Sequence, residues 1–127
     1  MRTIMLVGIA GAAGAVGRYA VSVVAVRLLG AGFAFGTLAV NVLGCLLLGA
    51  LLETERQTSV VTHPIRLLVA VGFLGAFTTF SAFGYETFRY LEQGTHHLAL
   101  LNVTANLVLG LGAVWLGWWL ARVMVAA

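Results

Sequence analysis

Asparagine side chains recur at helical spacing in two apolar segments of the sequence. Thr37, Asn41 and Cys45 follow one another at every fourth position. Asn102 and Asn106 have the same separation. Residues at this spacing share one face of a helix, so each segment presents a polar stripe. In an apolar setting such amides either join helices by hydrogen bonds or line a polar pathway. The spacing leaves both roles open for Asn41 and Asn106, and favours helix joining or a helix-end position for Asn102.

The segment from Gly72 to Gly84 combines glycine, hydroxyl and aromatic residues in a pattern that disfavours a continuous helix. It reads Gly-Phe-Leu-Gly-Ala-Phe-Thr-Thr-Phe-Ser-Ala-Phe-Gly. Glycines followed by hydroxyl and β-branched residues predict a local break, which frees backbone carbonyl groups. Inside a membrane those carbonyls must bind a partner or a cation, and broken helices recur where ions are bound.

Two phenylalanines follow the predicted break. Phe80 and Phe83 are three residues apart, so their rings share one face of the helix that resumes. The edges of these rings carry partial positive charge, which an anion in a dry passage can approach. On spacing alone, core packing is the commoner role of such a pair.

The titratable residues limit the chemistry that the chain can perform. No Asp or Glu lies in the middle of an apolar segment, and Glu86 and Glu92 fall toward the end of the third one. A proton-coupled transporter normally needs a titratable group along its path. The sequence has no nucleotide-binding loop, no metal-ligand cluster and no nucleophile–base pair, and His96 and His97 are expected in a turn. These features disfavour an enzyme and a pump, and they leave passive conduction of a small anion.

The elements that position these residues follow from the composition. The chain has 127 residues, 61% of them hydrophobic and 9% charged, with a mean hydropathy of +1.05. A soluble domain needs more charge than this, and roughly 20 apolar residues span a bilayer as a helix. We therefore expect one all-α membrane domain, residues 1–127, without a cleavable signal peptide. Its four transmembrane spans are expected at residues 3–29, 37–52, 64–91 and 98–123.

The arginines give only a weak preference for one orientation in the membrane. An even number of spans places both termini on one side. Four arginines fall on that side and two on the other: Arg2, Arg56, Arg66 and Arg122 against Arg27 and Arg89. By the positive-inside rule this bias is small. A small chain without a firm orientation is a candidate for an antiparallel homodimer.

Three motifs resemble signatures of the Fluc (CrcB) fluoride channel family. They are Gly14-Ala-Val-Gly-Arg-Tyr19, Gly36-Thr-Leu-Ala-Val-Asn-Val-Leu-Gly-Cys45 and Gly72-Phe-Leu-Gly-Ala-Phe-Thr-Thr-Phe-Ser-Ala-Phe83. The resemblance covers all four spans. It implies an antiparallel, dual-topology homodimer in a prokaryotic cell membrane, with two pathways that export fluoride passively.

The resemblance also implies roles for particular residues. Asn41 matches the family's pore asparagine, and Phe80 and Phe83 match its paired pore phenylalanines. A fluoride pathway must replace water with hydrogen-bond donors, for which hydroxyl and amide groups are suited. The further groups expected along the path are Thr79, Ser81 and Asn106.

Other matches concern the helix break and its surroundings. The backbone carbonyls of Gly75 and Thr78 match the positions that hold a central structural Na⁺. Arg18 matches the family's first-span arginine, and Glu86 matches the acidic residue after the phenylalanine pair. Members often carry hydroxyl residues at four positions where this chain has Ala82, Gly84, Gly110 and Val114. Some members carry an aromatic residue where this chain has Asn102.

Two other classes of protein deserve comparison. Proton-coupled multidrug exporters also have four short spans, but they carry an essential Glu in the middle of the first span, whereas this chain has no such Glu and has Arg18 nearby. In a membrane subunit that only packs against a partner, the Asn stripes and the break would serve packing alone. No nucleic-acid partner is expected.

Overall fold

The chain folds into four long helical segments, the third of which is composite. The structure, a computed structural model, describes residues 1–126, and every regular element in that range is helical. The elements are α1 (Arg2–Leu29), α2 (Phe35–Gln57), α3 (His63–Arg66), η1 (Leu67–Leu74), α4 (Gly75–Phe77), α5 (Phe80–Glu92) and α6 (His96–Ala126). Four segments are long and apolar enough to cross a membrane, namely α1, α2, the composite 63–92 and α6. The predicted all-α architecture with four spans is confirmed.

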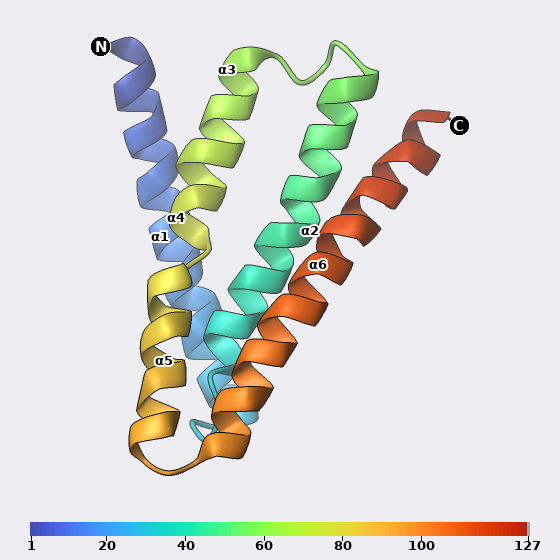
Figure 1. Cartoon of the computed structure of the whole chain (residues 1–127). Coiled ribbons are helices and arrows are strands. Elements are labelled where there is room, and N and C mark those ends of the chain that lie inside the picture. The colour runs from blue at the N-terminus through green and yellow to red at the C-terminus, as the bar shows by residue number, and fades with distance from the viewer. Residues whose placement is uncertain (127) are drawn as a thin grey trace.

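The helices run up and down between two ends of the molecule. The N-terminus, the α2–α3 connection and the end of α6 lie at one end, and the other two connections lie at the opposite end (Figure 1). Both ends of the described chain therefore lie on one side, as an even number of spans requires.

The third segment is interrupted at two consecutive threonines. Thr78 has φ −83° and ψ 160°, and Thr79 has φ −151° and ψ 116°, both of which are extended conformations. The ribbon shifts sideways at this point, between α4 and α5 (Figure 1). Helix α5 then restarts with Thr79 as its N-cap, whose hydroxyl accepts a hydrogen bond from the Ala82 N–H at 3.1 Å. The broken third helix is confirmed, and the break lies inside the predicted segment.

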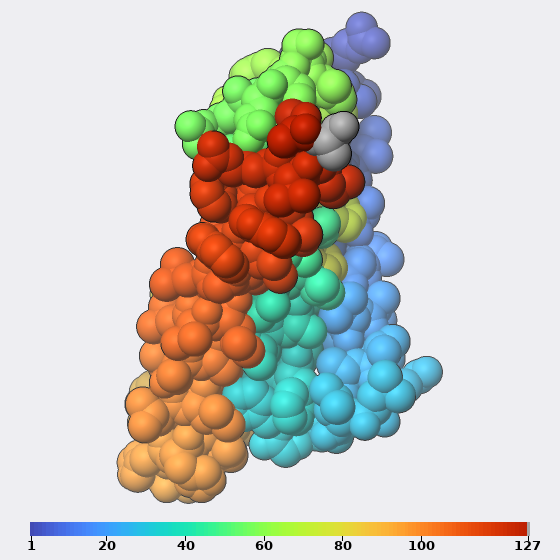
Figure 2. Space-filling model, turned by 90° about the vertical axis from the view of Figure 1, so that its right-hand side faces the viewer, coloured from blue at the N-terminus to red at the C-terminus, as the bar shows by residue number. Residues whose placement is uncertain are grey.

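Close backbone contacts hold the helices together. The most extensive packing is between α2 and α6, and α1 packs on η1, α2 and α4. Figure 2 shows α6 lying over α2 toward the end that carries the C-terminus. Gly117 of α6 faces the Leu46 carbonyl of α2, and Gly14 of α1 faces the Phe73 carbonyl of η1, so neither position has room for a Cβ atom. Small residues provide this closeness in lipid, where apolar burial cannot drive helix association.

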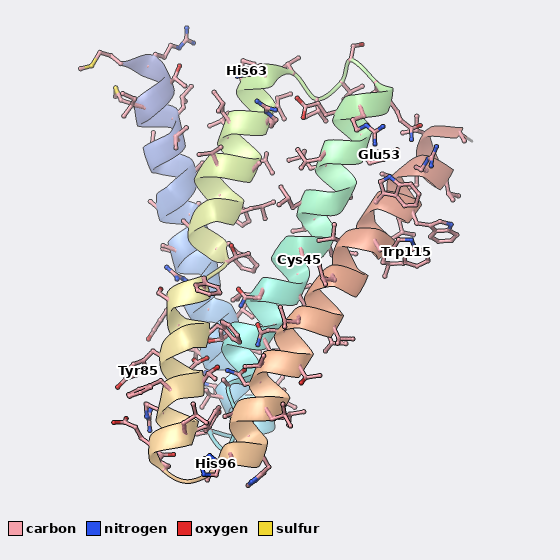
Figure 3. All side chains as sticks on the ribbon, in the orientation of Figure 1. Cys45, Glu53, His63, Tyr85, His96 and Trp115 are labelled. Carbon is pink, nitrogen blue, oxygen red and sulfur yellow. The ribbon has the colours of Figure 1, made fainter. Side chains whose placement is uncertain are left out.

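The helix ends differ from the expected spans by up to five residues. Helix α2 continues to Gln57, beyond the predicted end at residue 52, because the carboxylate of Glu53 is buried against α6. It lies 3.5 Å from Nε of Arg122, and Figure 3 shows Glu53 between the two helices. Helix α6 begins at His96, so both histidines belong to its first turn and not to the connection. The Thr95 carbonyl, which accepts the N–H groups of residues 98 and 99, starts the helix earlier than expected.

Candidate functional site

A pocket of about 360 Å³ lies beside the break in the third segment. Its walls come from α2, from the composite third segment (η1 to α5), and from α6. Most of the residues expected along the pathway or at the break line this pocket: Asn41, Gly75, Thr78, Thr79, Phe80, Phe83 and Asn106. Ser81 is not among the lining residues, but its hydroxyl lies 3.1 Å from that of Thr79. The fold therefore brings together in one pocket side chains that are as far apart in the sequence as Asn41 and Asn106.

Asn41 is the centre of the hydrogen bonds in the pocket. Its Nδ2 donates to the Thr79 carbonyl at 3.2 Å, and its Oδ1 accepts the Thr79 N–H at 2.9 Å. The same Nδ2 donates to Oδ1 of Asn106 at 2.9 Å. The polar stripes of α2 and α6 thus face each other, and Asn41 links both of them to the break.

Asn102 continues the amide stripe along α6 and joins that helix to α5. It is fully buried and accepts a hydrogen bond on Oδ1 from Nδ2 of Asn106 at 3.1 Å. Its own Nδ2 donates to the Thr87 hydroxyl on α5 at 2.9 Å. These contacts agree with a helix-joining role for Asn102. Thr87 escapes sequence analysis, because nothing in its spacing relates it to the asparagines.

The two phenylalanines form a pair at one wall of the pocket. Their ring centroids are 5.5 Å apart and the ring planes are inclined by 52°. Phe80 is 83% exposed, whereas Phe83 is half-buried. Phe80 is therefore not part of the core of the single chain.

The break leaves several carbonyl groups, among them those of Gly75 and Thr78, without the backbone partners of a continuous helix. The Thr79 N–H bonds to Asn41 and so does not bond to the Gly75 carbonyl four residues earlier. The Ala82 N–H likewise bonds to the Thr79 hydroxyl and not to the Thr78 carbonyl. Within residues 1–126 neither carbonyl oxygen accepts a backbone hydrogen bond. Hard oxygen donors of this kind suit an alkali cation, so these residues fit the expected Na⁺.

Glu86 and Arg18 lie outside this pocket. Oε1 of Glu86 accepts a hydrogen bond from the Thr37 hydroxyl at 2.7 Å, beside a second pocket of about 220 Å³. The buried Oε2 has no partner within residues 1–126. Arg18 is half-buried on α1 and lines neither of these two pockets. Thr37 was missed as a site residue, although its position one turn before Asn41 on the same helical face was a usable signal.

Comparison with known proteins identifies the family. Residues 5–118 match the model of the CrcB-like protein family, described as Camphor Resistance (CrcB). The chain belongs to the CrcB family. It is 44% identical over 122 residues to the fluoride-specific ion channel FluC of Geobacter sulfurreducens, which covers 96% of this chain and 98% of that one. It is 41% identical over 124 residues to the protein of the same name from Dehalococcoides mccartyi, covering 98% and 95%.

Membership in the CrcB family supports three predictions made from the sequence. The resemblance to this family is confirmed. The chain is a multi-pass membrane protein, because it has four candidate spans and its bacterial relatives are named ion channels. Those relatives are named as channels and not as enzymes, in agreement with the expectation that this chain is not an enzyme.

Proposed function

We propose that this CrcB protein is a passive, fluoride-selective channel that lets fluoride leave the cell. The observation that carries the proposal is the pocket that the Asn41 amide lines together with the pair Phe80 and Phe83. Relatives that are more than 40% identical and named fluoride-specific ion channels support the choice of anion.

The chemistry of the pocket suits a small anion with a strong hydration shell. Such an ion gives up water only where hydrogen-bond donors replace it. The Asn41 amide and the hydroxyls of Thr79 and Ser81 supply donors, and the edges of Phe80 and Phe83 supply partial positive charge. Within residues 1–126 the walls contain no basic side chain that would hold the ion too firmly for it to leave.

The working unit in this proposal is an antiparallel homodimer with two pathways, each lined by both copies. In one chain Phe80 is largely exposed, and Gly75 at the break is exposed as well. Free carbonyls facing lipid are costly, so a second copy that covers the break removes this penalty. The small arginine bias is compatible with insertion in both orientations.

In the same proposal a structural Na⁺ is held by the carbonyls of Gly75 and Thr78. When bound, the ion would neutralise the converging carbonyl dipoles where two breaks meet. It is not transported. This chain's part is to keep these oxygens free, which Asn41 and the Thr79 hydroxyl accomplish by taking the two N–H groups that would otherwise bind them.

The driving force is the fluoride gradient together with the membrane potential. Fluoride that enters a cell as the neutral acid ionises inside, and the channel allows the anion to leave. Within residues 1–126 the pathway pocket contains no acidic side chain that could couple this movement to protons.

The decisive experiment measures ion loss from liposomes that contain the purified protein. Fluoride-loaded and chloride-loaded liposomes are compared, with Phe80→Ile as the pathway variant and Phe88→Ile, also exposed on α5 but outside the pocket, as its matched control. We expect rapid fluoride loss, little chloride loss, and suppression by Phe80→Ile alone. No fluoride loss from a well-folded dimer would refute the proposal and favour a subunit that only packs against a partner.

A further inference from the structure

A chain of four side chains runs through the pathway pocket and out to helix α5. It links Asn41 of α2, Asn106 and Asn102 of α6, and Thr87 of α5. The successive donor–acceptor distances are 2.9 Å, 3.1 Å and 2.9 Å. The hydroxyl of Thr87 ends the chain by donating to the Phe83 carbonyl at 2.8 Å. We call this set the amide ladder.

The amide ladder has a fixed direction. Each member donates toward the Thr87 end, and the last acceptor is a backbone carbonyl, which cannot donate in return. A second carbonyl acts in the same way, because Nδ2 of Asn106 also donates to the Asn102 backbone oxygen at 2.9 Å. Turning the Asn106 amide over would set its oxygen against that carbonyl oxygen. Two backbone groups therefore determine which end of each amide faces the pocket.

As a consequence, Asn106 presents an oxygen to Asn41 and not an N–H group. The amide of Asn41 has two hydrogens. One is used by the Thr79 carbonyl, which belongs to the break, and the other by Oδ1 of Asn106. An anion can take the second hydrogen without disturbing the break, but only by displacing the oxygen of Asn106.

We propose that Asn106 is a built-in acceptor that competes with fluoride for Asn41, held in that orientation by Asn102 and Thr87. This inference rests on the proposed function. It makes Asn106 a hydrogen-bond acceptor in the pathway, where the expectation from the sequence was a donor. Between ions, Asn106 keeps the half-buried amide donor of Asn41 satisfied. When fluoride arrives, the Asn41 amide exchanges its hydrogen bond to Asn106 for one to fluoride. Because no additional bond is gained, the net binding of fluoride is weak enough for rapid release.

The proposal is tested by the concentration dependence of fluoride efflux from liposomes. Asn106→Leu has a similar shape but no acceptor, so it leaves the Asn41 hydrogen available. We expect the half-saturating fluoride concentration to fall between about twofold and tenfold, because one neutral hydrogen bond no longer competes. Asn41→Leu removes the donor itself and is expected to raise that concentration. A rise, or no change, for Asn106→Leu would overturn the proposal.

A second pair of variants tests the ladder farther from the pocket. Thr87→Val keeps the shape of the side chain but removes the hydroxyl, whereas Thr87→Ser retains it. We expect a smaller fall in half-saturating concentration for Thr87→Val and none for Thr87→Ser. If Asn106→Leu yields no folded protein, this pair decides, and equal values for the two variants would overturn the proposal.

The two proposals fail in different ways. A wild-type protein that releases no fluoride refutes the proposed function before any variant is compared. A wild-type protein that conducts fluoride, together with a raised half-saturating concentration in Asn106→Leu, overturns only the competing role of Asn106.

Discussion

Asn41 and Thr79 exchange two hydrogen bonds, one from the Asn41 amide to the Thr79 carbonyl at 3.2 Å and one from the Thr79 N–H to Oδ1 of Asn41 at 2.9 Å. A side chain of α2 thus takes both backbone groups of an extended residue in the third segment. This pairing replaces the bonds that a continuous helix would supply, and it fixes the break where the pathway residues meet.

The first prediction concerns Asn41→Ala. The variant loses both bonds to Thr79 and the donor that faces the pocket, so we expect fluoride efflux to fall by about tenfold or more. The matched control is Cys45→Ala, one turn farther along the same pocket wall. Efflux is measured from liposomes at equal protein density. An equal loss in both variants would show that general packing, and not the Asn41 amide, controls conduction.

The second prediction concerns the start of α5. The Thr79 hydroxyl accepts the Ala82 N–H, and losing such an N-cap costs about 1 kcal/mol. We expect Thr79→Val to speed hydrogen exchange of the Ala82 amide about fivefold, whereas Thr79→Ser should leave it unchanged. Exchange is followed residue by residue in detergent. Identical exchange in the two variants would mean that the hydroxyl does not stabilise this helix end.

The sequence alone predicted the four spans and the break, because both depend on local composition. Apolar length determines the spans, and the run of glycine, threonine and phenylalanine residues indicates the break within the segment 72–84. The spacing of Asn41 and Asn106 left open whether they join helices or line a pathway, since periodicity gives the face of a helix but not its neighbour.

Features that depend on contacts between distant residues could not be predicted. Thr87 joins the amide ladder only because α5 and α6 lie side by side, and nothing in its own surroundings marks it. The burial of Glu53 against Arg122 likewise depends on how α2 meets α6, so the end of α2 was placed too early. The antiparallel pairing and the Na⁺ site remain predictions.

The third prediction concerns the contact between α2 and α6. A Cβ atom at position 117 would meet the Leu46 carbonyl and, at 2.9 Å, the Ala50 nitrogen, so the two helices would have to separate. We expect Gly117→Ala to destabilise the folded protein by about 1–3 kcal/mol. Gly112→Ala on the same helix, where a Cβ atom meets nothing within 4 Å, is the control. Thermal unfolding in detergent compares them, and equal melting temperatures would refute the close packing at Gly117.

The fourth prediction concerns the buried carboxylate of Glu53. Only 4% of this side chain is exposed, and it lies 3.1 Å from Nη1 of Arg56 and 3.5 Å from Nε of Arg122. The Gln57 amide also donates to its Oε1, at 2.6 Å. Glu53→Gln keeps the size of the side chain but removes its charge. Both arginines are largely exposed, so water solvates part of their charge when the carboxylate is removed. We therefore expect Glu53→Gln to lower the free energy of unfolding by about 1–2 kcal/mol.

The matched control for Glu53 is Glu55→Gln, two residues away on α2. The Glu55 side chain is 27% exposed and lies 3.7 Å from Nε of Arg66, so solvent screens this pair more strongly. We expect a much smaller loss there, below about 0.5 kcal/mol. Unfolding can be followed by tryptophan fluorescence, because the ring of Trp118 lies 4.8 Å from the Arg122 guanidinium carbon. If the two variants lose equal stability, the carboxylate of Glu53 has no special role, and the extension of α2 to Gln57 must have another cause.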